Sequence, residues 1–159
     1  MANTTEIKIG QGLGDIKFGI SREKLKAMLG EPDEKESFSL AEDNSGDTTE
    51  SWHYDEHEFS ASFDEEFDWR LVRIAISSPE CELNGEKIIG LNKEQLLKKL
   101  DKLDFCDLDF EDLSSHDSTN QELVTADEYG MTFWLDNGIV SEIQWEPLFV
   151  DEETIRWPI

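Results

Sequence analysis

The segment GDIKFGISREKL, residues 14–25, returns further along the chain as GEKIIGLNKEQL, residues 85–96. Each copy of an internal repeat is one supersecondary unit that must bury its apolar face against a neighbour, so such a match indicates two related structural units. We therefore expect a first repeat in residues 1–79 and a second in residues 80–159, packed together as one compact unit.

The first repeat begins with a short helix and ends in strands. Ser21 is a typical N-cap residue, and the apolar residues after it recur at helical spacing until Gly30 and Pro32 end the helix. The polar, turn-rich residues 34–50 predict a long mobile loop. Alternating apolar residues then predict three strands with inward side chains at Trp52, Tyr54, Phe59, Ala61, Phe63, Val72, Ile74 and Ile76, the first two joined by a tight turn at Asp55 and Glu56.

The second repeat follows the same order. Asn92 and Gln95 have the spacing of a capping box at the start of a helix. After an acidic, irregular segment with a short strand or helical turn at Leu108 and Phe110, three strands are expected, with inward residues Met131, Phe133 and Leu135 on the middle one. Asp127-Glu128 and Asn137-Gly138 are the predicted hairpin turns, and residues 151–156 are a possible terminal helical turn.

These elements predict an α+β fold of two tandem repeats. Each repeat is expected to be a helix followed by a three-stranded antiparallel meander, with the helices packed on one face of the sheet. The other face is then left open unless a partner covers it.

Charge is the second informative feature of the chain. It carries 38 acidic residues against 14 lysines and arginines, a formal net charge of −24, and residues 103–155 contain no lysine or arginine. Such a field repels nucleic acid and anionic membranes, so we expect neither as a partner. It attracts a basic protein and speeds the encounter of that protein with the chain. The alternative is that the charge only keeps the protein soluble.

We expect a cytoplasmic protein. Residues 1–6 lack the basic and apolar regions of a secretory signal, and no stretch has the apolar length of a transmembrane helix.

No segment carries a recognised catalytic motif. His53 and His57 have the spacing of a helical metal pair but lie in a predicted strand and turn, where their side chains diverge. The segment 43–54 opens like a calcium loop but has Thr48 and Tyr54 where glycine and glutamate are needed. The acidic residues of 64–68 are more simply explained as a solvated loop than as an acid–base pair. We therefore expect no metal, no cofactor and no catalytic residue.

The run IKFGIS at residues 16–21, the helix ending LGEP at 29–32 and the meander opening WHY at 52–54 resemble a small bacterial repeat. Two copies of it form the β-lactamase inhibitor proteins, and one copy forms the small lipoprotein of the outer-membrane barrel assembly machinery. The resemblance implies protein–protein binding through a concave sheet. No inhibitory residue of that family can be matched here, so none is transferred, and direct β-lactamase inhibition is not expected.

The open face of the predicted sheet is the candidate partner-binding site. If the middle strand of the second repeat points Met131, Phe133 and Leu135 inward, then Trp134 points outward, and a tryptophan among polar groups has the chemistry of an interface hot spot. The alternative is that Trp134 is covered by residues 104–119 or by the C-terminal residues 157–159. The predicted binding residues are Trp134, Thr132, Glu142, Gln144, His53, Glu58, Ser60, Ser62 and Arg73.

Together these patterns predict a non-enzymatic, acidic protein-binding module, most simply a bacterial immunity or inhibitor protein that neutralises a basic toxin or enzyme. One alternative is a small-ligand-binding protein or hydrolase with an acidic pocket between the repeats, which a desolvated carboxylate in a deep pocket would support. Another is an intracellular interaction domain with no toxin involved.

Overall fold

The computed structural model describes residues 5–39, 48–105, 108–112, 121–126 and 129–148. Within these residues the protein is mostly β, with thirteen strands in two sheets and two α-helices. The first half holds β1 (Glu6–Lys8), β2 (Gly12–Leu13), β3 (Ile16–Lys17), α1 (Arg22–Leu29), β4 (Glu34–Ser39), β5 (Thr48–Tyr54), β6 (Phe59–Asp64), a 3₁₀ turn (Glu65–Phe67) and β7 (Arg70–Ile76). The second half holds β8 (Glu82–Leu83), β9 (Glu86–Lys87), α2 (Lys93–Lys102), β10 (Leu108–Asp112), β11 (Gln121–Ala126), β12 (Met131–Asp136) and β13 (Ile139–Trp145).

The predicted fold class is wrong. In place of two tandem units of one helix and three strands, the chain forms an antiparallel sheet in the order β10-β11-β12-β13-β7-β6-β5-β4 and a small sheet in the order β3-β2-β1-β8-β9. One reason is β4, which occupies part of the predicted 34–50 loop and pairs with β5 over six residues. Its charged and polar sequence suits an edge strand, where charges discourage further pairing.

The small sheet was missed for a different reason. β2, β3, β8 and β9 have only two residues each, too few to show an alternating pattern. The sheet is held together by the parallel pairing of β1 with β8, which joins residues Ile7 and Leu83 from distant parts of the chain.

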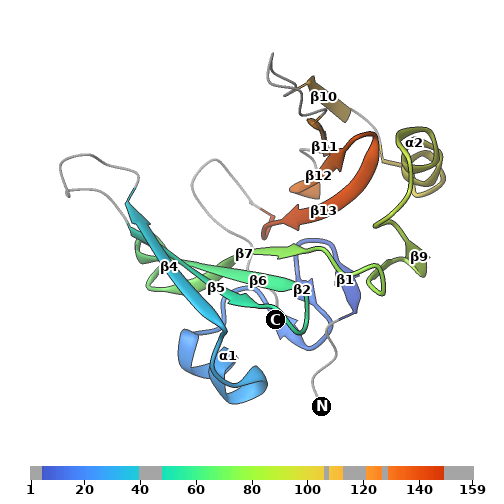
Figure 1. The fold of residues 1–159 in the computed structure, drawn as a ribbon. Coiled ribbons are helices and arrows are strands. Elements are labelled where there is room, and N and C mark those ends of the chain that lie inside the picture. The colour runs from blue at the N-terminus through green and yellow to red at the C-terminus, as the bar shows by residue number, and fades with distance from the viewer. Residues whose placement is uncertain (1–4, 40–47, 106–107, 113–120, 127–128, 149–159) are drawn as a thin grey trace.

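Figure 1 shows the large sheet bending between β7 and β13, with α1, α2 and β1 of the small sheet all on one side of it. The core lies on that side. It is one cluster of buried side chains that includes Leu25 of α1, Leu96 and Leu100 of α2, and the alternating residues of the central strands. The opposite side of the large sheet carries no helix among the described residues.

Several local predictions are confirmed. The Ser21 hydroxyl accepts a hydrogen bond from the Lys24 backbone N–H (3.1 Å) at the start of α1, and Asn92 and Gln95 form the capping box of α2. Asn137 and Gly138 both have positive φ in the two-residue turn between β12 and β13. Predicted turns at 127–128 and 151–156 lie outside the described residues.

Two strand details differ from the predictions. The connection from β5 to β6 has four residues rather than a tight two-residue turn, and it ends at Glu58 with φ +51°. A register shift between β6 and β7 buries Leu71 and leaves Val72 half-buried, because the extra residue of a bulge reverses the alternation beyond it.

Candidate functional site

The side of the large sheet opposite the helices presents a continuous row of paired residues across all eight strands. Each member is directly opposite the next in the strand register, from Glu34 on β4 to Asp109 on β10, through His53, Ser60, Ala75, Gln144, Thr132 and Thr125. Adjacent positions on the same side are Glu36, Ser51, Ser62 and Arg73 at one end, and Glu142, Trp134, Leu123 and Glu111 at the other. We call these sixteen residues the open face.

The structure places eight of the nine predicted binding residues on the open face. Glu58 is the ninth, and it lies in the turn between β5 and β6, exposed and next to His53 and Ser60. Trp134 is half-buried, and its indole Nε1 is shielded from solvent without a hydrogen-bond partner among the described residues. The segments 113–120 and 149–159, which include most of the residues expected to cover it, lie outside the described part of the chain.

The sequence-based prediction did not include Glu34 and Glu36, because residues 34–50 were expected to form a loop, and it did not include Ser51, which lies between that loop and Trp52. Residues 34–39 are mainly charged and polar, a composition that a solvated loop shares, so no apolar alternation marks them as a strand. Pairing with β5 places Glu34 and Glu36 on the same side of β4, and it brings Glu34 opposite His53 and Glu36 opposite Ser51.

Short hydrogen bonds tie neighbouring strands of the open face together. The Ser51 and Ser62 hydroxyls lie 2.8 Å apart, and His53 Nδ1 lies 2.7 Å from Ser60 Oγ. His53 Nε2 has only the Glu36 carboxylate nearby, at 3.5 Å, and no hydrogen-bond partner among the described residues. The Glu36 carboxylate, whose side chain is 47 % exposed, remains accessible to another molecule.

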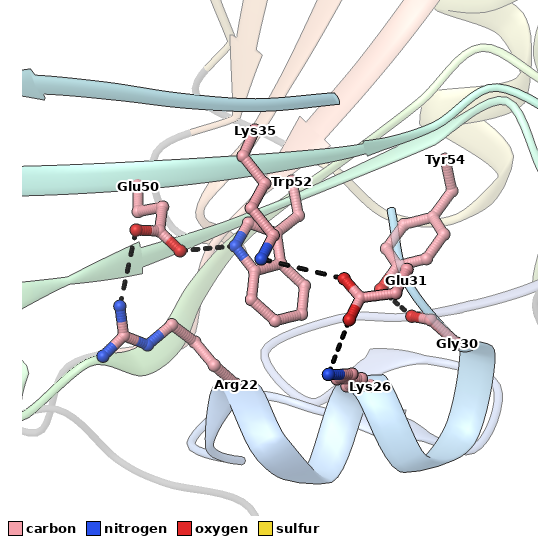
Figure 2. Close-up of polar contacts among 8 residues, drawn as sticks. All are labelled: Arg22, Lys26, Gly30, Glu31, Lys35, Glu50, Trp52 and Tyr54. Atoms are coloured by element: carbon pink, nitrogen blue, oxygen red, sulfur yellow. Dashed lines mark hydrogen bonds and ion pairs between the residues drawn. The ribbon is translucent and has the colours of Figure 1, made fainter. Parts of the chain in front are cut away.

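Some acidic residues outside the open face are paired with cations within the fold. Figure 2 shows the helix side of β4 and β5, where Arg22 pairs with Glu50 at 3.4 Å and Glu31 lies between Lys26 and Lys35, at 2.5 and 3.8 Å. The carboxylates of Glu31 and Glu50 on this side therefore have cations beside them, whereas Glu34 and Glu36 of β4 face the other way.

Glu86 gives the clearest case of internal pairing. Lys99 and Lys102 of α2 both donate to its carboxylate, at 2.7 and 2.9 Å, and these hydrogen bonds lower its pKa to about 2. On the open face the charge is not balanced in this way. Its only lysine or arginine is Arg73, which is already bound to Glu146 through two hydrogen bonds of 3.0 and 2.8 Å.

Glu142 shows the opposite behaviour. It is half-buried on β13, and burial raises the pKa of its carboxyl, although the hydrogen bond from Gln144 Nε2 (3.0 Å) acts the other way. Within the described residues no lysine or arginine forms an ion pair with it. Glu142 is thus a partly desolvated carboxylate with no cation beside it in the part of the chain that the structure describes.

This arrangement has a consequence for stability. A carboxyl whose pKa is raised in the folded state binds more protons there than in the unfolded chain, so its contribution to stability falls as pH rises from about 4.5 through the folded pKa. Glu142→Gln removes the charge and retains an oxygen that accepts from Gln144. We expect the variant to unfold roughly 1–3 °C above the wild type at neutral pH, a small shift because solvent screens a half-exposed charge.

The same comparison by calorimetry near pH 3.5 should show no difference, because Glu142 is then protonated in both folded and unfolded wild-type protein. Glu94→Gln on the exposed surface of α2 is the control, and no stabilisation is expected from it. A Glu142→Gln variant less stable than the wild type at neutral pH would show that the carboxylate has a stabilising partner.

The other candidate sites from the sequence are not assembled. His53 faces Ser60 on the open face, whereas the His57 ring packs against the Tyr54 ring, which belongs to the core. Glu65, one of the acidic residues considered for acid–base chemistry, accepts a hydrogen bond from the Thr48 backbone N–H. The calcium-like sequence at 43–47 lies outside the described residues.

In the part of the chain that the structure describes, neither helix has the length and hydrophobicity needed to cross a membrane. Comparison with known proteins finds no family model, no curated protein and no solved structure that matches the chain.

Proposed function

We propose that the chain is a non-enzymatic binding protein that uses its open face to hold a basic protein partner, as an immunity or inhibitor protein holds a toxin or enzyme. The observation that carries this proposal is the difference between the two sides of the large sheet. Glu31, Glu50, Glu86 and Glu122 on the helix side are paired with lysine or arginine, whereas among the described residues Glu34, Glu36 and Glu142 on the open face form no ion pair with either.

Charge complementarity gives the binding a physical basis. With a net charge of −24 the protein attracts a basic partner over a distance comparable to the Debye length, about 8–10 Å at physiological salt. An acidic face whose single arginine is already bound to Glu146 directs that partner to one side of the sheet.

The test is affinity capture from the native cell with the immobilised chain, at about 50 mM and 500 mM salt. The open-face variant is Glu34→Gln, Glu36→Gln and Glu58→Gln. Its matched control is Glu23→Gln, Glu94→Gln and Asp101→Asn on the exposed surfaces of the helices, which changes the net charge by the same amount.

We expect the wild type and the helix variant to capture the same basic protein at low salt, and the open-face variant to capture much less of it. High salt should weaken capture by all three. Equal capture by the open-face variant and loss of capture by the helix variant would place the interface on the helix side and overturn the proposal.

A further inference from the structure

The open face is not flat where its two halves meet. A hollow of about 380 Å³ lies over β4, β5, β6, β7 and β13, and it is lined on its polar side by Glu34, Glu36, His53, Glu58, Ser60 and Glu142. Ligand sites in proteins begin at about 300 Å³, so the hollow has room for one long side chain but not for a folded element.

The lining of this hollow has one sign of charge. Five of its residues are carboxylates, the four glutamates just named and Asp55, and none is lysine or arginine. Among the described residues the only basic group in ion-pair distance of these carboxylates is the His53 ring, beside Glu36.

Two of the lining groups are partly withdrawn from water and only partly satisfied by neighbouring groups. His53 Nε2 is shielded from solvent and has no hydrogen-bond partner among the described residues. Glu142 is half-buried and accepts one hydrogen bond, from Gln144. Because a buried polar group without a partner costs free energy, a cation that donates several hydrogen bonds here would recover part of that cost.

We propose that the hollow receives an arginine side chain from the basic partner. This inference rests on the proposed function, and it names the group on the partner that the open face recognises. A guanidinium group has five N–H donors in a planar fork and is weakly hydrated, so it can satisfy carboxylates that approach from different strands. Glu34 and Glu36 line the hollow from β4, Glu58 lines it from the turn after β5, and Glu142 lines it from β13.

An ammonium group fits the same charge less well. Lysine has three donors around one compact, strongly hydrated point, so it gains less from carboxylates spread around a hollow. Citrulline provides the sharper comparison, because it has nearly the shape of arginine but no charge. The three side chains therefore separate the contributions of charge, donor geometry and shape.

The test uses three capped tripeptides, Gly-Arg-Gly, Gly-Lys-Gly and Gly-citrulline-Gly, titrated into the ¹⁵N-labelled full chain at low salt. We expect the arginine peptide to shift the backbone resonances of His53, Ser60 and Glu142. Its dissociation constant should be in the millimolar range, at least threefold lower than that of the lysine peptide and tenfold lower than that of the citrulline peptide.

Glu36→Gln with Glu142→Gln should weaken binding of the arginine peptide about tenfold, whereas Glu94→Gln with Asp101→Asn should leave it unchanged. Circular dichroism checks that both variants are folded. Equal binding of the arginine and citrulline peptides, or shifts confined to residues outside the hollow, would overturn the inference.

The two proposals can fail separately. If the chain captures a basic protein through the open face but the arginine peptide does not shift the hollow residues, the arginine inference is wrong and the proposed function stands. If the peptide binds in the hollow but no basic protein is captured, the hollow recognises a guanidinium group and the proposed function is wrong.

Discussion

Replacement of Trp145 by alanine is expected to lower the free energy of unfolding by about 3–5 kcal/mol, the usual cost of removing a buried tryptophan or phenylalanine. Trp145 is fully buried near the end of β13, and its indole Nε1 donates a hydrogen bond of 3.1 Å to the Gly12 carbonyl of β2. This single side chain therefore packs the core of the large sheet and links it to the small one. Urea unfolding followed by far-ultraviolet circular dichroism measures the change.

Trp145→Phe separates the two contributions. It keeps most of the buried ring and loses the hydrogen bond, so we expect a cost of about 1–2 kcal/mol, the sum of a lost hydrogen bond and a small change in packing. Ile139→Ala, on an exposed side chain of the same strand, should change stability by less than about 1 kcal/mol. Equal unfolding midpoints for Trp145→Ala and the wild type would contradict the observed packing of the two sheets.

Replacement of Trp134 by alanine is expected to raise the dissociation rate of the complex with the captured basic protein about 30-fold, the effect of a hot spot worth about 2 kcal/mol. The association rate should change far less, because it depends on the long-range charge of the chain rather than on one aromatic contact. Surface plasmon resonance with the immobilised partner gives both rate constants. Raising salt from about 50 to 500 mM should slow association at least tenfold.

Trp69→Ala is the matched control for Trp134→Ala. Trp69 is also half-buried, but its ring lies beneath the Arg22 guanidinium, at 4.4 Å, beside α1 rather than on the open face. Its replacement should lower stability and leave both rate constants unchanged. An unchanged dissociation rate for Trp134→Ala would remove this residue from the interface, and association independent of salt would remove the electrostatic part of the account.

Signals within a few residues of one another were sufficient to predict the ends of the helices and one hairpin. Ser21 and Asn92 accept hydrogen bonds from backbone N–H groups three residues ahead, and Asn137 with Gly138 forms a turn that needs only those two residues. Such features depend on local backbone chemistry, and for that reason composition and spacing identify them.

The fold class could not be obtained in the same way. β4 is exposed on both sides of much of its length, so it lacks the apolar alternation that marks a half-buried strand. The parallel contact of Ile7 with Leu83 and the antiparallel contact of Ile143 with Ile76 join segments far apart in the sequence. Pairings of that kind depend on the packing of the whole chain, and no short pattern specifies them.

Part of the candidate site could be predicted from the sequence. Alternation on β6 and β12 was enough to place Ser60, Ser62, Thr132 and Trp134 on the side opposite the core. The hollow could not be predicted, because its lining includes Glu36 of β4 and Glu142 of β13, which are four strands apart in the sheet. Only the order and register of the complete sheet show that these carboxylates line one hollow.

Carboxyl footprinting of the complex tests most directly whether the open face holds the partner. Carbodiimide activation with glycine ethyl ester labels accessible carboxyl groups, and mass spectrometry reads the extent of labelling with and without the captured protein. The account predicts that Glu34, Glu36 and Glu58 lose labelling in the complex while Glu23, Glu94 and Asp101 of the helices keep it. Protection of the helix residues with full labelling of the open face would contradict it.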